Sequence, residues 1–348
     1  MKQTFFVKKG EVAIKETEKP AIEQSTDAII RIVRASVCGS DLWWFRGISP
    51  RVAGPAGGHE AIGVIEEVGS DVKNFKVGDF VVIPFTDACG HCRNCLAGFE
   101  ASCVNAGHAS HSGYQIEFLR KINADGSLVK IPGQPSDYTE DQLASLTTLA
   151  DVMPTGYHSA WAAEIKPGDT VVVFGDGAVG LCAVIGAKLM GAGRIIAMSR
   201  HEDRAALARE FGATDIVPER GAAAVDKILE MTDGFGADAV LECVGMKEAV
   251  ETAFQVAAPG AKVSRVGVPH DVDYNPYMNK LFYQNIALTG GIASVTKHDR
   301  ELLLEKVLDG SINPGRVFTA SFTLDEIQAA YDAMDQRKAI KSLLTVSD

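Results

Sequence analysis

A glycine-rich motif between a predicted strand and a predicted helix constrains the fold of this chain most. Gly175, Gly177 and Gly180 follow an apolar run at 170–174 and open an Ala-, Leu- and Val-rich segment at 178–190. A G-x-G-x-x-G match alone is a weak signal, but this position is the one that a dinucleotide-binding turn requires. Gly175 would permit the tight turn, Gly177 the approach of a pyrophosphate, and Gly180 close strand–helix packing. The alternative is a glycine turn with only a structural role.

Strands and helices alternate regularly after this motif. Further strands are predicted at 194–198, 237–243, 261–266 and 286–289, and helices at 203–211, 221–232 and 247–257. This alternation predicts an α/β domain in which helices cover both faces of a doubly wound parallel sheet.

The chain is too long for a single core, because cores usually stop growing near ~250–300 residues and this chain has 348. Residues 27–37 alternate and are β-branched, which predicts a strand, and 59–85 carry short apolar runs between glycines. We therefore expect a compact β-barrel before the parallel sheet. The last ~50 residues break the alternation and are expected to return to that first domain.

The end of the second predicted strand decides between NAD and NADP. NAD enzymes usually place a carboxylate there to bind the ribose 2′-hydroxyl. Here the strand ends in Ser199-Arg200, and Arg204 follows on the next helix. Because a guanidinium pairs well with phosphate, these residues predict NADP. Asp176 places a negative charge in the glycine loop, and we expect it to point away from the phosphates.

Two observations keep other readings of this strand end open. A small shift in register would bring Glu202 or Asp203 to the position of the usual carboxylate, which would favour NAD. Arg200 could also be a solvated surface residue.

Four cysteines gather within residues 89–103, namely Cys89, Cys92, Cys95 and Cys103. No secretory signal is recognisable, so we expect a cytoplasmic protein with reduced thiols, and clustered cysteines then favour metal over disulfides. Four thiolates with C-x₂-C spacing are typical of closed, structural zinc sites. The alternatives are four free core cysteines or an iron–sulfur cluster.

Charge and hydropathy limit the partners. The formal net charge of −11 argues against sequence-independent binding to nucleic acid, which needs a basic face. No run approaches the ~18 apolar residues that span a bilayer. We expect neither nucleic acid nor a membrane as a partner.

Three dispersed segments complete the pattern: Cys38-Gly-Ser40-Asp41, Gly58-His59-Glu60, and Asp151-Val-Met-Pro-Thr155-Gly. Spacing alone does not connect them. In this order, with the four-cysteine loop and the glycine motif, they resemble the alcohol dehydrogenase group of the zinc-dependent medium-chain dehydrogenase/reductase family over essentially the whole chain. The resemblance implies a GroES-like catalytic domain, residues 1–153 and 291–348, with a Rossmann domain, residues 154–290, inserted between its parts.

The resemblance also assigns the metal ligands. It implies that Cys38, His59 and Asp151 bind a catalytic zinc, that Glu60 is an additional ligand, and that Asp41 fixes His59. Aspartate as the third ligand resembles the bacterial NADP-dependent secondary alcohol dehydrogenases and the formaldehyde dehydrogenase-like branch.

Further roles follow from the same resemblance. Thr155 would lie against the nicotinamide and Lys341 near the cofactor phosphates. Ser40 would take the alcohol proton as a relay while hydride passes to the nicotinamide. Trp43 stands where many family members have a relay histidine, so the proton is expected to leave by another route. The family also implies a homodimer or homotetramer.

The substrate pocket is predicted less directly. Trp43, Trp44 and Phe85 are candidates for an apolar wall, although aromatic residues lie more often in a core than in a pocket. His108 and His111 could line the pocket or lie in a surface loop.

These observations predict a zinc-dependent enzyme that transfers hydride between a secondary alcohol, or its ketone or aldehyde, and NADP(H). Each chain would hold one catalytic and one structural zinc ion. The alternatives are an NAD-dependent polyol or sugar dehydrogenase, a formaldehyde-type dehydrogenase, and a non-catalytic NADPH-binding relative.

Overall fold

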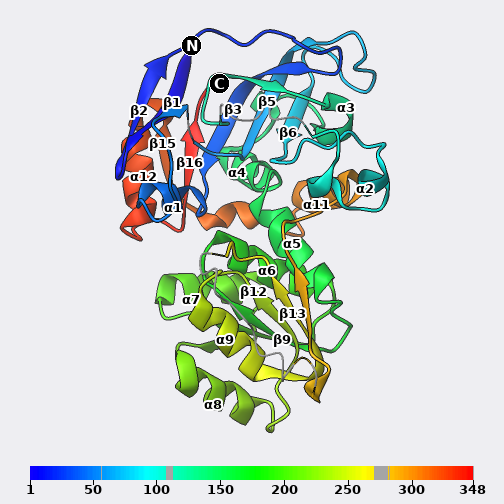
Figure 1. Cartoon of the computed structure of the whole chain (residues 1–348), viewed down its shortest axis with the longest axis vertical. Coiled ribbons are helices and arrows are strands. Elements are labelled where there is room, and N and C mark those ends of the chain that lie inside the picture. The colour runs from blue at the N-terminus through cyan, green and yellow to red at the C-terminus, as the bar shows by residue number, and fades with distance from the viewer. Residues whose placement is uncertain (56, 107–112, 270–280, 282, 348) are drawn as a thin grey trace. The chain divides into compact units, whose positions relative to one another are not determined.

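The computed structural model describes the chain except for residues 56, 107–112, 270–280, 282 and 348. It divides into two compact units, one formed by Met1–Asp151 with Ser294–Asp348 and the other by Val152–Ala293. Both chain termini belong to the first unit (Figure 1). The sequence analysis placed the boundaries at 153/154 and 290/291.

The first unit contains a seven-stranded and a three-stranded sheet. The larger sheet has the order β15-β16-β3-β5-β6-β8, with β7 also paired to β3, and the smaller has the order β2-β1-β4. The last strand lies antiparallel to β3, with Ser342 opposite Val37 and Leu344 opposite Ala35. The C-terminal segment therefore completes a sheet that begins near the N-terminus.

The strands of this unit are β1 (Lys2–Lys8), β2 (Glu11–Glu16), β3 (Ala28–Val37), β4 (Gly54–Pro55), β5 (Ala61–Val68), β6 (Phe80–Ile83), β7 (Phe118–Lys121), β8 (Val129–Ile131), β15 (Phe318–Thr323) and β16 (Lys341–Thr345). Its described α-helices are α1 (Asp41–Phe45), α2 (Arg93–Leu96), α3 (Ala124–Ser127), α4 (Glu140–Thr148), α11 (Lys297–Leu308) and α12 (Ile327–Asp335). Short 3₁₀ turns lie at Glu100–Ser102, Pro135–Asp137, Pro314–Val317 and Leu324–Glu326.

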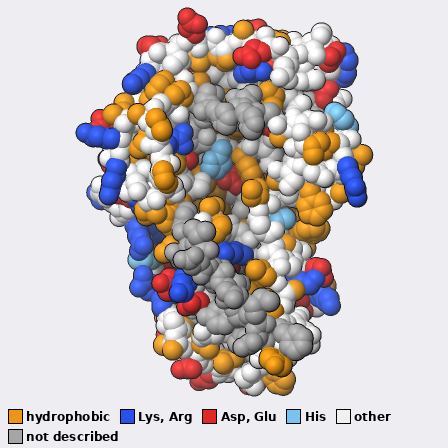
Figure 2. Space-filling model, in the orientation of Figure 1, with side chains coloured by type: hydrophobic (Ala, Val, Ile, Leu, Met, Phe, Trp, Pro, Cys, Tyr) orange, Lys and Arg blue, Asp and Glu red, His pale blue; other side chains and the backbone are white. Residues whose placement is uncertain are grey.

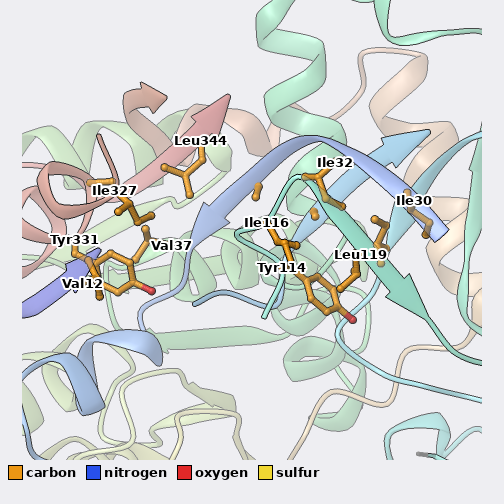
Figure 3. Packing of buried hydrophobic residues seen from close by; sticks show 14 of the residues in the cluster. Val12, Ile30, Ile32, Val37, Tyr114, Ile116, Leu119, Ile327, Tyr331 and Leu344 are labelled. Carbon is orange, nitrogen blue, oxygen red and sulfur yellow. The ribbon is translucent and has the colours of Figure 1, made fainter. Parts of the chain in front are cut away.

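One buried cluster joins elements that are far apart in the sequence. Figure 3 shows Ile30 and Ile32 of β3, Tyr331 of α12 and Leu344 of β16 among its members. Burying a side chain such as Ile or Leu stabilises the fold by roughly 1.5–3 kcal/mol relative to leaving it exposed. This cluster fixes β3, whose end carries the first predicted metal ligand.

The second unit is a six-stranded sheet in which every pair is parallel, with the order β11-β10-β9-β12-β13-β14. Its strands are β9 (Thr170–Phe174), β10 (Arg194–Met198), β11 (Asp215–Val217), β12 (Ala237–Glu242), β13 (Ala257–Arg265) and β14 (Ala287–Gly290). Its described helices are α5 (Val152–Ala162), α6 (Ala178–Leu189), α7 (Glu202–Phe211), α8 (Gly221–Met231) and α9 (Lys247–Val256).

The strand order of this sheet reverses beside β9, as in doubly wound dinucleotide-binding folds. Consecutive residues of β9, β10 and β12 are buried, which indicates that both faces of the sheet are covered. The predicted α/β fold class is confirmed. The short strand β11 was not predicted, because a run of only three residues gives too weak a periodic signal.

Acidic and basic side chains are interspersed on the face in view in Figure 2. Within the described residues, no helix combines the length and apolar character needed to cross a membrane.

Candidate active site and metal centres

The dispersed ligands predicted for a catalytic metal come together in the first unit. Cys38 follows β3, His59 and Glu60 precede β5, and Asp151 follows α4. One potential ligand atom from each of these four residues lies within 4.8 Å of the others. Cys38, Glu60 and Asp151 are buried, and His59 is half-buried.

The Asp151 carboxylate lies at the middle of this group. Its Oδ2 is 3.0 Å from His59 Nε2 and accepts a hydrogen bond from Cys38 Sγ at 3.7 Å. Burial lowers the pKa of His59, but Cys38 and Asp151 outweigh this effect and raise that pKa well above its usual value. The surrounding groups therefore favour positive charge at this point, as a metal ion would provide.

Glu60 supports the same interpretation. Its side chain is 1% exposed, and its Oε2 is bonded by Ser36 Oγ and Lys341 Nζ. Its Oε1 is buried without a hydrogen-bond partner, a state that normally costs about 1–3 kcal/mol. Thiolate, imidazole and carboxylate are all zinc ligands, so these residues fit a zinc ion.

Asp41 supports this group chiefly through Cys38. Its Oδ2 accepts a hydrogen bond of 3.0 Å from the Cys38 backbone N–H, whereas its Oδ1 lies 3.9 Å from His59 Nδ1. The second distance is too long for a hydrogen bond. In this structure Asp41 is a hydrogen-bond partner of Cys38 and an electrostatic neighbour of His59, and its role in fixing His59 stays a prediction.

The four predicted cysteine ligands also converge. The Sγ atoms of Cys89, Cys92, Cys95 and Cys103 lie within 4.8 Å of one another. Backbone N–H groups donate to three of them, at 3.3 Å from Cys89 to Cys103, 3.3 Å from Cys92 to Cys89 and 3.5 Å from Cys95 to Cys92. Such bonds favour thiolates, and backbone hydrogen bonds from Cys95 and Val104 lower the pKa of Cys92 to about 6. The group fits a closed tetrahedral metal site.

Helix α11 holds this loop in place. The Glu100 carboxylate, between Cys95 and Cys103, accepts a hydrogen bond of 3.1 Å from the Lys297 backbone N–H. The buried Arg300 guanidinium lies 3.5 Å from the same carboxylate. A carboxylate at a helix N-terminus is electrostatically favourable, so Glu100 anchors the loop to the helix.

In the second unit, the glycine loop has the geometry that the motif predicted. Gly175 has φ +110°, which is strained for other residues. A Cβ at Gly180 would lie 1.9 Å from the Gly175 carbonyl oxygen, whereas one at Gly177 would meet no atom within 4 Å. Gly177 begins α6 without a side-chain cap. The open space and the helix N–H groups fit a bound pyrophosphate.

The residues predicted to bind a 2′-phosphate lie beside this loop, but Asp176 lies among them. Ser199 Oγ donates to Asp176 Oδ2 at 2.8 Å, and Arg204 Nη1 lies 3.4 Å from Asp176 Oδ1. Arg200 is exposed. Ser199 and Arg204, which were predicted to bind the 2′-phosphate, thus donate hydrogen bonds to the Asp176 carboxylate.

The comparisons with known proteins agree with this geometry. Residues 24–133 match the family described as alcohol dehydrogenase GroES-like domain, and residues 178–308 match zinc-binding dehydrogenase. The NADP-dependent isopropanol dehydrogenase of Thermoanaerobacter brockii is 32% identical, and the match covers 97% of each chain. The chain belongs to the zinc-dependent alcohol dehydrogenase family. The predictions of this family and of an enzyme are confirmed.

Other relatives of this alcohol dehydrogenase family member support the same placement. Zinc-type alcohol dehydrogenase B of Aspergillus flavus is 38% identical over 279 residues, which span 77% of this chain and 64% of that protein. The structure of zinc dependent alcohol dehydrogenase 2 from Streptococcus pneumonia, apo form, is 32% identical with a TM-score of 0.89. That match covers 100% of this chain and 99% of the other.

The aromatic candidates for the pocket of this family member separate into two groups. Phe85 is half-buried, and its ring stands edge-on to His59 with 6.0 Å between centroids. Trp44 is a core residue, because it is 8% exposed and packs 5.1 Å from Phe6 and 5.4 Å from Tyr331. Of the two positions that the sequence left open for Trp44, pocket wall and core, the structure supports the core. Trp43 is half-buried on α1.

Three further predictions concern residues around the cofactor and substrate. Thr155 is buried on α5 in the second unit, and its contact with nicotinamide stays a prediction. Lys341 belongs to the first unit, where its amine pairs with Glu60 and donates to the Val37 carbonyl at 3.1 Å. Its approach to the cofactor phosphates also stays a prediction. His108 and His111 lie outside the described residues.

The sequence analysis missed two residues next to the family's sites. Ser36 bonds Glu60 and lies near the end of β3, two residues before Cys38. Arg220 follows β11, which runs parallel to β10 with Val217 opposite Met198. Residues after both strands meet at one sheet edge, so Arg220 could have been found had β11 been predicted.

Proposed function

We propose that this chain transfers a hydride between a secondary alcohol or its ketone and NADP(H), with one zinc ion at Cys38, His59 and Asp151 and another at the four cysteines. The convergence of the first three side chains, with the orphaned Glu60 Oε1 beside them, carries this proposal. Zinc bound there would supply Lewis acidity that lowers the pKa of an alcohol and polarises a carbonyl, while nicotinamide would exchange the hydride.

Ser40 is the residue that we propose to handle the substrate proton. It lies two positions after Cys38, is half-buried, and begins α1 without a hydrogen bond from its hydroxyl to the helix. The Ser40 hydroxyl therefore does not cap the helix. It can accept a proton from an alcohol while it donates its own hydrogen to a second acceptor. Serine acts here as a relay, because its own pKa is too high for a general base.

Phe85 is the residue that supports an apolar substrate. Its ring lies against His59, within the group of metal ligands. An aromatic surface at this point favours the alkyl part of a small or medium alcohol over the hydroxyl-rich surface of a sugar.

The basic residues after β10 and β11 support NADP as the cofactor. Ser199, Arg200, Arg204 and Arg220 provide a hydroxyl and three guanidinium groups at one edge of the sheet. Charge-assisted hydrogen bonds from arginine suit a phosphate dianion. The Thermoanaerobacter brockii relative is described as NADP-dependent. We further propose a cytoplasmic location and a homodimer or homotetramer.

One observation favours a second candidate, an NAD-dependent polyol dehydrogenase. The Asp176 carboxylate accepts a hydrogen bond from Ser199, and a carboxylate in this pocket could equally accept one from a ribose hydroxyl. A non-catalytic NADPH-binding protein is disfavoured because the described residues include two groups of potential metal ligands.

Absorbance at the reduced-nicotinamide band distinguishes these candidates. With zinc-replete protein and 2-butanol, we expect kcat/KM with NADP to exceed that with NAD by at least about tenfold, or 1.4 kcal/mol. Arg204→Ala should raise KM for NADP by about tenfold and leave KM for NAD unchanged, because only NADP carries the 2′-phosphate. Arg209→Ala, an exposed arginine on the same helix that pairs with Glu202, is the matched control. Turnover only with NAD, or only with a polyol, would contradict the proposal.

A further inference from the structure

The carboxylate of Asp176 accepts hydrogen bonds from Ser199 and Arg204, which are donors of the proposed phosphate pocket. Ser199 is 2% exposed, and its hydroxyl donates to Asp176 Oδ2 at 2.8 Å. Arg204 Nη1 lies 3.4 Å from Asp176 Oδ1 and 3.3 Å from the Asp176 carbonyl oxygen. The side chains of Arg204 and Asp176 are 14% and 19% exposed, so this pair is largely shielded from water.

Three arginines come from the segments that follow β10 and β11. Arg200 follows β10, Arg204 lies in α7, and Arg220 precedes α8. Burial lowers the pKa of Arg220, Arg200 lowers it further, and Asp176 and Glu219 raise it. Asp176 thus offsets part of the repulsion between Arg200 and Arg220, and it pairs directly with Arg204.

A 2′-phosphate and this carboxylate need the same donors. Both groups are anionic acceptors, and an ionised carboxylate has no hydrogen to donate to phosphate. Phosphate binding must therefore displace Asp176 from Ser199 and Arg204, or place two negative charges side by side. A ribose 2′-hydroxyl imposes neither cost, because it can donate to the carboxylate.

We propose that Asp176 is a specificity-determining residue that competes with the 2′-phosphate for Ser199 and Arg204, so that the enzyme retains use of NAD. The inference rests on the proposed binding of NADP at this pocket. In the absence of the phosphate, Asp176 holds Ser199 and Arg204 in its place, and this competition weakens the preference for NADP.

Direct binding of 2′-AMP tests this role without turnover, because 2′-AMP carries the discriminating phosphate but no nicotinamide. Isothermal titration calorimetry would compare wild type with Asp176→Asn, which keeps the shape and removes the charge. We expect Asp176→Asn to bind 2′-AMP at least about tenfold more tightly, since one like charge is removed from a shielded pocket. In turnover assays, Asp176→Ala should raise KM for NAD several-fold and leave kcat within about twofold.

Asp203→Asn is the matched control, because it removes the same charge from an exposed side chain in the first turn of α7. It should change 2′-AMP binding by less than about twofold. Circular dichroism and the melting temperature of each variant would establish that its fold is intact.

The outcomes separate this inference from the proposed function. Wild type that binds 2′-AMP, together with an Asp176→Asn variant that binds it equally or more weakly, would overturn the role of Asp176 and leave NADP use in place. Absence of 2′-AMP binding in both proteins would overturn the phosphate pocket itself. Tighter binding by Asp176→Asn alone among the variants would support the inference.

Discussion

Asp151→Ala should lower kcat/KM for 2-butanol by at least about 10³-fold. A metal ion contributes several kcal/mol of charge stabilisation in such reactions, and each 1.36 kcal/mol corresponds to about tenfold in rate. Asp151 Oδ2 is the atom that approaches both His59 Nε2, at 3.0 Å, and Cys38 Sγ, at 3.7 Å. Removing it should lower the zinc content from about two atoms per chain to about one, as measured by mass spectrometry of the metal.

A graded control accompanies this variant. Asp41→Asn changes a group that supports Cys38 through its backbone N–H, and such outer partners typically contribute 10–100-fold to metal affinity or activity. We therefore expect a loss in that range with both zinc atoms retained at saturating metal. An Asp151→Ala protein that keeps both zinc atoms and most of its turnover would exclude Asp151 as a ligand.

Lys341→Ala should destabilise the first unit by about 3–5 kcal/mol, the usual cost of breaking a buried ion pair from one side. Lys341 and Glu60 are each 1% exposed, so alanine would leave the buried Glu60 carboxyl without the cation that lowers its pKa. At about 2–4 °C per kcal/mol, the melting temperature should fall by roughly 10 °C in a thermal scan near neutral pH. A shift below about 2 °C would contradict the account of this pair.

The pH dependence of this pair has a defined sign. Burial lowers the pKa of Lys341, but Glu60 and Cys38 outweigh it, and the result is a pKa above the ordinary 10.5. At the alkaline end, the contribution of the Lys341 charge is therefore fully present just below pH 10.5 and is lost as the pH rises through the folded pKa of Lys341. At the acid end the pair also needs Glu60 ionised, and burial raises the pKa of Glu60. Lys338→Ala, an exposed lysine nearby, should leave the melting temperature unchanged.

Local sequence patterns predicted the second unit well. The strand before Gly175 is a short run of buried apolar residues. The spacing of Gly175, Gly177 and Gly180 then predicts a tight turn into the next helix. Parallel strands linked by helices then restrict the topology to a doubly wound sheet. The elements depend mainly on neighbouring residues, and that is why the sequence suffices.

Long-range packing was the part that composition and periodicity could not supply. The pairing of β16 with β3 joins residues about 300 positions apart, such as Leu344 and Ala35. The break in the strand–helix alternation predicted a return to the first domain, but not this pairing. The position of Trp44 is similar, because its partners Phe6 and Tyr331 come from opposite ends of the chain. An aromatic residue suits both a core and a pocket, and tertiary contacts decide between them.

The direction of a side chain was also beyond the sequence. The sequence placed the negative charge of Asp176 in the glycine loop. Its hydrogen bond to Ser199, however, depends on how the loop and the end of β10 approach each other. The ligand set of Cys38, His59 and Asp151 shows the same limit, since these residues meet only through the folded barrel.

The most direct test of the central claim is turnover of 2-butanol with NADP, measured against zinc content in the wild-type protein. Chelation should remove zinc from the Cys38, His59 and Asp151 centre and abolish the absorbance change at the reduced-nicotinamide band. Added zinc should restore the rate in proportion to the metal regained at that centre. A protein stripped of zinc at both groups that still turns over at the full rate would contradict the account.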